Sequence, residues 1–335
     1  MSPLSQRISR LLIRIVIPWS LTVGAVWMVS RGMEWGQFWS CIQGVRPAYL
    51  GFPIALTVLS YFWRTLRWRH LFPREVPSIK VAYKALIFGF FMNNILPARA
   101  GELVRAHVGA RLSGESRSLV LATIAAERLL DGVALSVLLA IGSITMGILG
   151  LHVAEYAHQL QYVGVAFGVG GLLTVLLLSQ RGLVDSLLLK FEGMLAGSRF
   201  TVVLSKIRHF IEGLTPLLCP RRLPIILGWT SVVWGLELMV FWVVASAYGV
   251  HLTLYQAIFF LVSSNFASLI PAAPGGIGIV EAVATAVLVS MGVARESAFA
   301  MALTQHVIQY AMVGVPGLYL LLRFRELRGV VASPS

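Results

Sequence analysis

Two short stretches of the sequence place amides, prolines, glycines and a carboxylate between apolar segments. The first is "NNILPARAGE" at residues 93–102, and the second is "NFASLIPAAPGGIGIVE" at residues 265–281. Both run in the same order: an apolar helix, Asn, Pro, Gly, Glu and a second apolar helix. Because proline removes a backbone donor and glycine permits a tight reversal, we expect each stretch to break a helix in two.

The second half of each broken helix has the features of an anion site. It would begin with free N–H groups and the positive end of the helix dipole, where phosphate groups bind. Arg99 lies in the first break and Arg105 follows it, and an arginine can hold a phosphate through two hydrogen bonds. The alternative is that both arginines lie at the membrane interface. The candidate substrate-binding residues are Asn93, Asn94, Pro97, Arg99, Gly101, Arg105, Arg128, Asn265, Pro271, Pro274, Gly275, Gly276 and Gly278.

A second set of polar residues lies inside apolar helical sequence. Glu127 and Asp131 share one helix face, and Arg128 lies beside them. A charge in the membrane costs at least about 2.5–3.5 kcal/mol, so these three must be paired, protonated or hydrated. They form either a structural ion-pair network, with Arg99 or Arg105 as further partners, or a site of substrate contact or proton coupling.

Other carboxylates and amides fall in equally apolar surroundings. Glu102 and Glu281 lie in the first turns of half-helices, where they either complement the dipole or titrate. Glu237 is alone in its helix, and lone acids within membrane spans are functional by default. The candidate coupling or charge-network residues are Glu102, Glu127, Asp131, Glu237, Glu281, Gln305 and Gln309.

The elements that would position these residues are membrane helices. The chain has 335 residues, 57% hydrophobic and 12% charged, whereas a soluble domain carries about 25% charged residues. Long apolar runs predict an all-α polytopic membrane protein with about six transmembrane helices. Two apolar segments stop at the breaks and resume beyond them, so we expect two re-entrant hairpins. The predicted spans are 12–30, 47–63, 118–148, 162–180, 223–248 and 298–322, and the hairpins are 81–96 with 102–112 and 254–270 with 279–292.

The basic residues set the predicted topology. With this arrangement most Lys and Arg fall on one side, including a predicted loop from Arg64 to Lys84, and only Arg31, Arg46 and Arg295 fall on the other. The positive-inside rule then makes both termini cytoplasmic. Anionic headgroups account for the net charge of +13 without any nucleic-acid partner.

The two stretches also indicate an internal repeat within one membrane domain that covers 1–335. The repeat cores are 47–148 and 223–322, and an amphipathic interfacial connector is predicted at 182–215. The predicted topology places the first hairpin in from the cytoplasm and the second in from outside, so the repeats are inverted. Inverted repeats with broken helices are typical of secondary transporters, which bind their substrate near the membrane midplane.

At "NNILPARAGELVRA", "AAERLLDG" and "IPAAPGGIGIVEA" the sequence resembles the lysylphosphatidylglycerol synthase transmembrane family. The resemblance implies an integral protein of a bacterial-type inner membrane that moves lipids between leaflets. Relatives are tied to aminoacylated phosphatidylglycerol, polyprenyl-linked sugars or hopanoids. The synthases carry an aminoacyl-transferase domain after the membrane part, and this chain ends at Ser335, so synthase activity is not implied.

The sequence therefore favours a lipid flippase for an anionic phospholipid or polyprenyl-phosphate headgroup. The alternative is a membrane-embedded enzyme, or an accessory subunit, that acts on a lipid-linked phosphate or sugar. No DxD or HExxH pattern and no nucleotide-binding motif occurs, so we expect a transporter without metal or cofactor, driven by a gradient or passive. A homo-oligomer or a partnering lipid-synthesis enzyme is left open.

Overall fold

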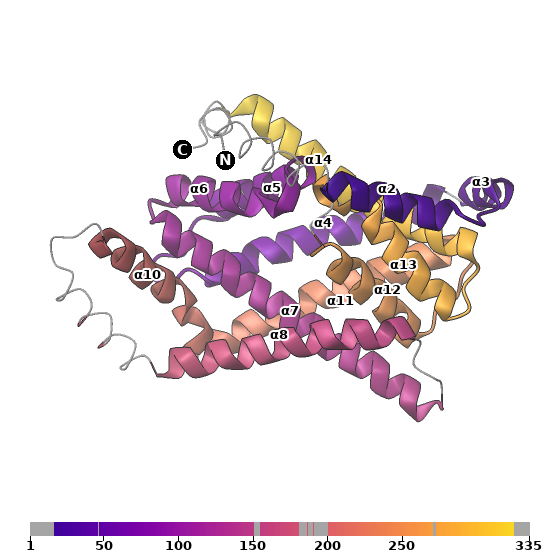
Figure 1. Ribbon diagram of the computed structural model, residues 1–335. Coiled ribbons are helices and arrows are strands. Elements are labelled where there is room, and N and C mark those ends of the chain that lie inside the picture. The colour runs from indigo at the N-terminus through magenta and orange to yellow at the C-terminus, as the bar shows by residue number, and fades with distance from the viewer. Residues whose placement is uncertain are drawn as a thin grey trace, which may run out of the picture.

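The computed structural model describes residues 17–45, 47–150, 155–180, 186, 190, 200–270 and 273–324, and within them it contains helices joined by turns and no strands. Twelve α-helices and three short 3₁₀ turns fall within these ranges (Figure 1). Pro271 and much of the predicted connector at 182–215 lie outside the described residues. The predicted all-α class is confirmed.

Two sets of four helices follow one another in the same order. Each set consists of a long helix, two short helices and a second long helix. The first set is α4 (Pro47–His70), α5 (Ile79–Ile95), α6 (Gly101–Ser113) and α7 (Arg117–Ile148). The second set is α11 (Leu223–Ala247), α12 (Leu254–Ala267), α13 (Ile279–Ser290) and α14 (Arg295–Arg323). The other helices are α2 (Ile17–Ser30), α3 (Trp35–Gly44), α8 (Glu155–Ser179) and α10 (Phe200–Leu214).

The short helices of each set pack against one another. Helices α5 and α6 have 17 and 13 residues, and α12 and α13 have 14 and 12. A helix needs about 20 residues to cross a bilayer, so none of the four is long enough to do so alone. The 3₁₀ turn η2 (Pro97–Arg99) precedes α6, and η4 (Pro274–Gly276) precedes α13. The sequence therefore predicts both helix breaks correctly.

Contacts between the two sets are reciprocal. The first helices, α4 and α11, pack against each other across the middle of the molecule (Figure 1). Helix α5 of the first set packs on α14 of the second, and α12 of the second set packs on α7 of the first. Buried apolar side chains form a core along each of these contacts.

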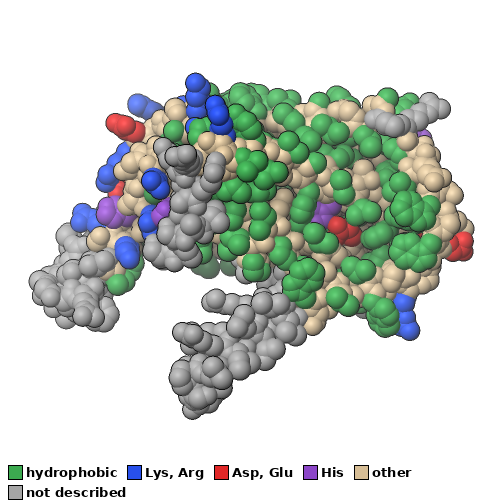
Figure 2. Space-filling model, turned by 90° about the horizontal axis from the view of Figure 1, so that it is seen from above, with side chains coloured by type: hydrophobic (Ala, Val, Ile, Leu, Met, Phe, Trp, Pro, Cys, Tyr) green, Lys and Arg blue, Asp and Glu red, His purple; other side chains and the backbone are tan. Residues whose placement is uncertain are grey.

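Three described helices are long and apolar enough to cross a membrane: Arg117–Ile148, Leu223–Ala247 and Arg295–Arg323. They match three of the predicted spans. Hydrophobic side chains also cover much of the surface seen in Figure 2, and the Lys and Arg side chains gather toward one end of that view. A surface of this kind suits a lipid environment.

The predicted end of the second span is wrong. We expected it at residue 63, followed by a basic loop, but α4 continues to His70 and carries Arg64 and Arg67 into the interior. The side chain of Arg67 is fully buried. Arginines next to an apolar run look like loop residues, and only their carboxylate partners on other helices make this burial tolerable.

Gly101→Ala should destabilise the protein, because the new methyl group would overlap the carbonyl oxygen of Gly89 and the backbone nitrogen of Asn93. Overpacking of this kind costs roughly 1–3 kcal/mol. That exceeds the roughly 0.5–1 kcal/mol that alanine gains over glycine in a helix. Thermal unfolding in detergent micelles should therefore show a lower melting temperature.

Gly51→Ala on α4 is the matched control, since nothing lies within 4 Å of a Cβ atom at that position. It should melt at or above the wild-type temperature. Equal melting temperatures for the Gly101 and Gly51 variants would contradict the close packing of α5 on α6.

Candidate functional site

A cavity of about 340 Å³ lies where the two helix breaks meet. From the first break it is lined by Asn93, Asn94, Arg99 and Glu102, and from the second by Asn265, Ser268, Gly275 and Gly276. Helices α4, α7, α11 and α14 complete the wall with Arg64, Arg128, Glu237, Gln305, His306, Gln309 and Tyr310 among others. Segments about 170 positions apart in sequence thus form one site.

Arg99 joins the two breaks directly. Its Nη2 donates a hydrogen bond to Ser268 Oγ at 2.7 Å, and its Nε donates to the Ser268 carbonyl oxygen at 3.1 Å. Among the described residues, Arg99 is the one residue other than glycine that has a positive φ, which is 55°. Because that conformation is costly for a side chain with a Cβ atom, the surrounding contacts must hold it.

The second break depends on glycine and on neighbouring side chains. Gly275 has φ of 68°, and a Cβ atom there would overlap the hydroxyl of Tyr310, which donates to the Pro274 carbonyl at 3.0 Å. From α2, Thr22 Oγ1 accepts from the Ala273 N–H and donates to the Ile277 carbonyl, each at 3.2 Å. These contacts satisfy backbone groups that the break would otherwise leave without partners.

The N-terminus of α13 is partly capped. The Gly278 N–H donates to Glu281 Oε2 at 2.7 Å, and the other oxygen of Glu281 lies 2.6 Å from His306 Nδ1. His306 lines the cavity, whereas Glu281 lies behind it. The carboxylate therefore complements the start of α13, as one of the two sequence interpretations proposed.

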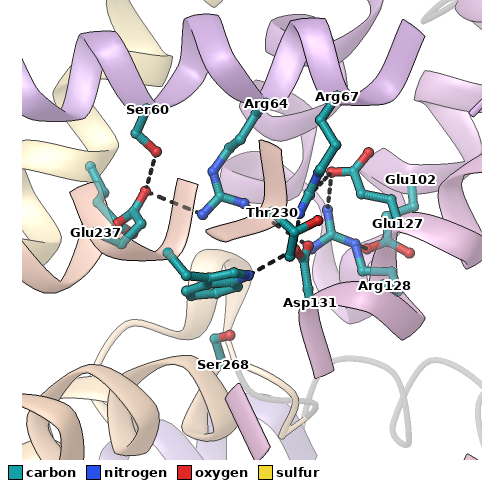
Figure 3. A network of polar contacts seen from close by, with 12 residues as sticks. Ser60, Arg64, Arg67, Glu102, Glu127, Arg128, Asp131, Thr230, Glu237 and Ser268 are labelled. Carbon is teal, nitrogen blue, oxygen red and sulfur yellow. Dashed lines mark hydrogen bonds and ion pairs between the residues drawn. The ribbon is translucent and has the colours of Figure 1, made fainter. Parts of the chain in front are cut away.

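A network of buried ion pairs lies beside the cavity and joins α4 to α7 and α11 (Figure 3). Arg67 lies 2.6 Å from Asp131 and 3.3 Å from Glu127. Arg64 lies 3.2 Å from Glu237 and 4.0 Å from Asp131. The acids of α7 and α11 are thus paired, which agrees with the ion-pair alternative given for Glu127 and Asp131 and shows that Glu237 has a partner on another helix.

Arg105 and Arg128 complete this network. Arg105 is 1% exposed, lies 2.6 Å from Glu127 and stacks over the ring of Trp68. The prediction that it could lie at the membrane interface is wrong, because its guanidinium is needed as a partner for a fully buried carboxylate. Arg128 lies 3.0 Å from Glu102 and 3.5 Å from Asp131.

The charges of the site do not cancel. Among the described residues, five arginines belong to the network or the cavity wall, namely Arg64, Arg67, Arg99, Arg105 and Arg128. They face four carboxylates, Glu102, Glu127, Asp131 and Glu237. Arg99 is the arginine with the weakest pairing, at 4.0 Å from Glu102, and its side chain is 33% exposed. A cavity with this excess suits a phosphate or another anion.

The structure divides the predicted site residues into two groups. Those that line the cavity are Asn93, Asn94, Arg99, Glu102, Arg128, Glu237, Asn265, Gly275, Gly276, Gln305 and Gln309. Those that lie outside it are Pro97, Gly101, Arg105, Glu127, Asp131, Pro274, Gly278 and Glu281, which break, pack or cap the helices or pair behind the wall. Pro271 lies outside the described residues.

Sequence reasoning missed Arg64 and Arg67. Their spacing of three places both on one face of a helix, and Glu237 had no cation assigned to it. Either signal could have found them. Among the described residues, no cluster of three or more His, Cys, Asp or Glu side chains is arranged to hold a metal ion.

Comparison with known proteins identifies the family. The profile described as "Lysylphosphatidylglycerol synthase TM region" matches residues 11–317, so the chain belongs to this family of multi-pass membrane proteins. It is 26% identical to the glycosyltransferase AglD of Haloferax volcanii over 91% of its own length and 53% of that protein's. It is 24% identical to a UPF0104 membrane protein of Pyrococcus horikoshii over 85% and 88% of the two lengths. The chain thus spans about half of the glycosyltransferase and most of the UPF0104 protein.

Arg67→Met should strongly destabilise the protein, since it removes the nearer of the two arginines that Glu127 and Asp131 share. Removing one member of a buried ion pair costs about 3–5 kcal/mol. A lower melting temperature and a lower yield of folded protein in detergent are expected. Arg74→Gln, which breaks an exposed ion pair with Glu212, should change the melting temperature little.

Asp131→Asn added to Arg67→Met should recover part of the lost stability, because it removes the stranded charge. A single Arg67→Met variant that melts like the wild type would show that the network does not hold these helices together.

Proposed function

We propose that this protein moves an anionic lipid headgroup between the leaflets of a membrane. The observation that carries this proposal is the meeting of two helix breaks in one polar cavity, with Arg99 of one break bonded to Ser268 of the other. A polar cavity between broken helices is how secondary transporters bind substrates inside the bilayer. Belonging to a lipid-handling family supports the proposal.

The phosphate would bind at Arg99. The other two arginines on the cavity wall are already engaged, Arg64 by Glu237 and Arg128 by Glu102. Among the described residues, Arg99 donates hydrogen bonds only to the hydroxyl and carbonyl of Ser268. A phosphate oxygen is a stronger acceptor for a guanidinium than either group, so it can replace Ser268 and loosen the contact between the breaks.

The lipid chains would stay in the bilayer. Leu269 and Ile270 line the cavity next to the second break, and they are also exposed on the molecular surface. The cavity therefore reaches an apolar face. A headgroup could enter the polar interior there while its acyl or prenyl chains remain among other lipids.

The membrane arrangement that goes with this function has six spans and two re-entrant hairpins, α5–α6 and α12–α13. We infer that the two helix sets are inverted repeats, since their order is the same and their contacts are reciprocal. Both termini would be cytoplasmic, in a bacterial-type inner membrane. The breaks would then meet near the midplane, at a depth that a headgroup must pass in either direction.

A membrane enzyme is the second candidate. The relative from Haloferax volcanii is named a glycosyltransferase, although the chain covers only 53% of it. An enzyme would turn over a lipid-linked phosphate or sugar chemically, whereas a flippase returns its lipid unchanged. Chromatography of a labelled lipid after incubation with the purified protein separates the two.

Arg99→Gln should slow headgroup translocation by at least about tenfold, because a hydrogen bond to a charged group contributes roughly 1.5–3 kcal/mol. The assay is dithionite quenching of fluorescently labelled phosphatidylglycerol in proteoliposomes. Arg111→Gln is the control, since that arginine is exposed on the same hairpin and lies outside the cavity. Both variants should retain most of the wild-type melting temperature. A wild-type rate for Arg99→Gln would remove this arginine from the mechanism.

A further inference from the structure

Five carboxamide side chains surround the cavity that we assign to the headgroup. Asn93 and Asn94 come from α5, Asn265 from α12, and Gln305 and Gln309 from α14. A carboxamide both donates and accepts hydrogen bonds. It is therefore matched to hydroxyl groups, which also do both, and not to phosphate alone, which only accepts.

Several of these amides are free to bind a ligand. Gln305 is 2% exposed, yet its side chain makes no hydrogen bond to any residue that the structure describes. The same holds, within the described ranges, for the side chain of Asn94. Gln309 uses its Nε2 to bond Glu237 at 3.2 Å, and Asn265 bonds the Leu261 carbonyl at 2.8 Å. Asn93 Oδ1, in the same lining, is buried and has no hydrogen-bond partner among the described residues. Because buried amide atoms rarely remain without partners in native proteins, this oxygen is an independent sign of a hydrogen-bonding ligand.

The carboxylates at the cavity are, by contrast, already used. Glu237 accepts from Ser60 at 2.7 Å, from Arg64 at 3.2 Å and from Gln309. Glu102 lies 3.0 Å from Arg128. An ammonium group entering the cavity would meet an excess of arginine and no unpaired carboxylate in the described part of the wall, so its charge would be buried without a partner.

We infer that the cavity selects a phosphate bearing a neutral, hydroxyl-rich group, and that it rejects a cationic aminoacyl headgroup. The phosphate binds Arg99, and the hydroxyls bind the amides of Gln305, Asn94 and their neighbours. The volume of about 340 Å³ lies at the lower end of the usual range for ligand pockets, about 300–1,000 Å³, and suits a headgroup without its chains. This inference rests on the proposed function and defines its substrate class.

The test compares the affinities of four short-chain lipids for the full-length protein in detergent, measured by microscale thermophoresis. Dioctanoyl phosphatidylinositol and citronellyl mannosyl phosphate carry hydroxyl-rich groups on a glycerol lipid and a prenyl lipid respectively. Dioctanoyl phosphatidylmethanol carries a phosphodiester without free hydroxyls. Dioctanoyl lysylphosphatidylglycerol carries the cationic group.

One or both hydroxyl-rich lipids should bind about tenfold more tightly than phosphatidylmethanol, and the tighter of the two identifies the lipid type. The lysyl lipid should bind at least about tenfold more weakly than the preferred one. Gln305→Leu should lower the affinity for the preferred lipid about tenfold, whereas Gln43→Leu on the exposed face of α3 should not change it.

A second, independent variant, Gln305→Glu, tests for a gain in affinity for the lysyl lipid. Its new carboxylate should raise the affinity for the lysyl lipid about tenfold, which a variant that fails to fold could not do. If the wild-type protein bound the lysyl lipid as tightly as the hydroxyl-rich lipids, this inference would be overturned, and the proposed flippase function would still stand. Failure of all four lipids to bind, or wild-type affinities for every lipid in Arg99→Gln, would overturn the proposed function and this inference together.

Discussion

The fold depends on the burial of arginine–carboxylate pairs between α4, α7 and α11. Arg67 lies 2.6 Å from Asp131 and 3.3 Å from Glu127, with no solvent exposure of its side chain. Charges in such surroundings persist only when they are paired, and removing one partner costs about 3–5 kcal/mol, a large part of a stability of about 5–15 kcal/mol. The pairs fix the register of three long helices, and this register holds the two short hairpins face to face. The two helix breaks can meet because the buried charges on the surrounding helices are paired.

Among the described residues that line the cavity, Arg99 is the one weakly paired cation, 4.0 Å from Glu102. Arg99 occupies a left-handed backbone conformation in the first break and reaches Ser268 in the second. Glycines and Tyr310 shape the opposite side, so that backbone and side chains approach the space closely. On the proposed function, stability and binding are divided between two groups of charges. Arg64, Arg67, Arg105 and Arg128 hold helices together, and Arg99 is available to an anion.

The helix breaks, the helical class and 11 of the 25 residues that line the cavity could be predicted from the sequence. Prolines, glycines and amides rarely cluster in apolar sequence unless a helix is interrupted there. The burial of Arg64 and Arg67 could not be predicted, since an arginine beside an apolar run looks the same in a loop as in an ion pair. Nor could the sequence separate Glu102, which lines the cavity, from Glu281, which lies behind it. Those distinctions depend on which distant helix supplies the partner, and spacing along one chain does not encode it. Family membership agrees with the motifs.

The central claim is that the two breaks enclose a hydrated, electropositive cavity within the membrane. The most direct test is the reactivity of single cysteines in proteoliposomes, in a chain whose native Cys41 and Cys219 are replaced by serine. Ser264→Cys lines the cavity, whereas Val262→Cys lies on the same helix, α12, in the dry core. We predict that a negatively charged thiosulfonate modifies residue 264 about tenfold or more faster than a positively charged one of similar size, and that residue 262 does not react. No reaction at residue 264, or faster reaction with the cationic reagent, would contradict the claim.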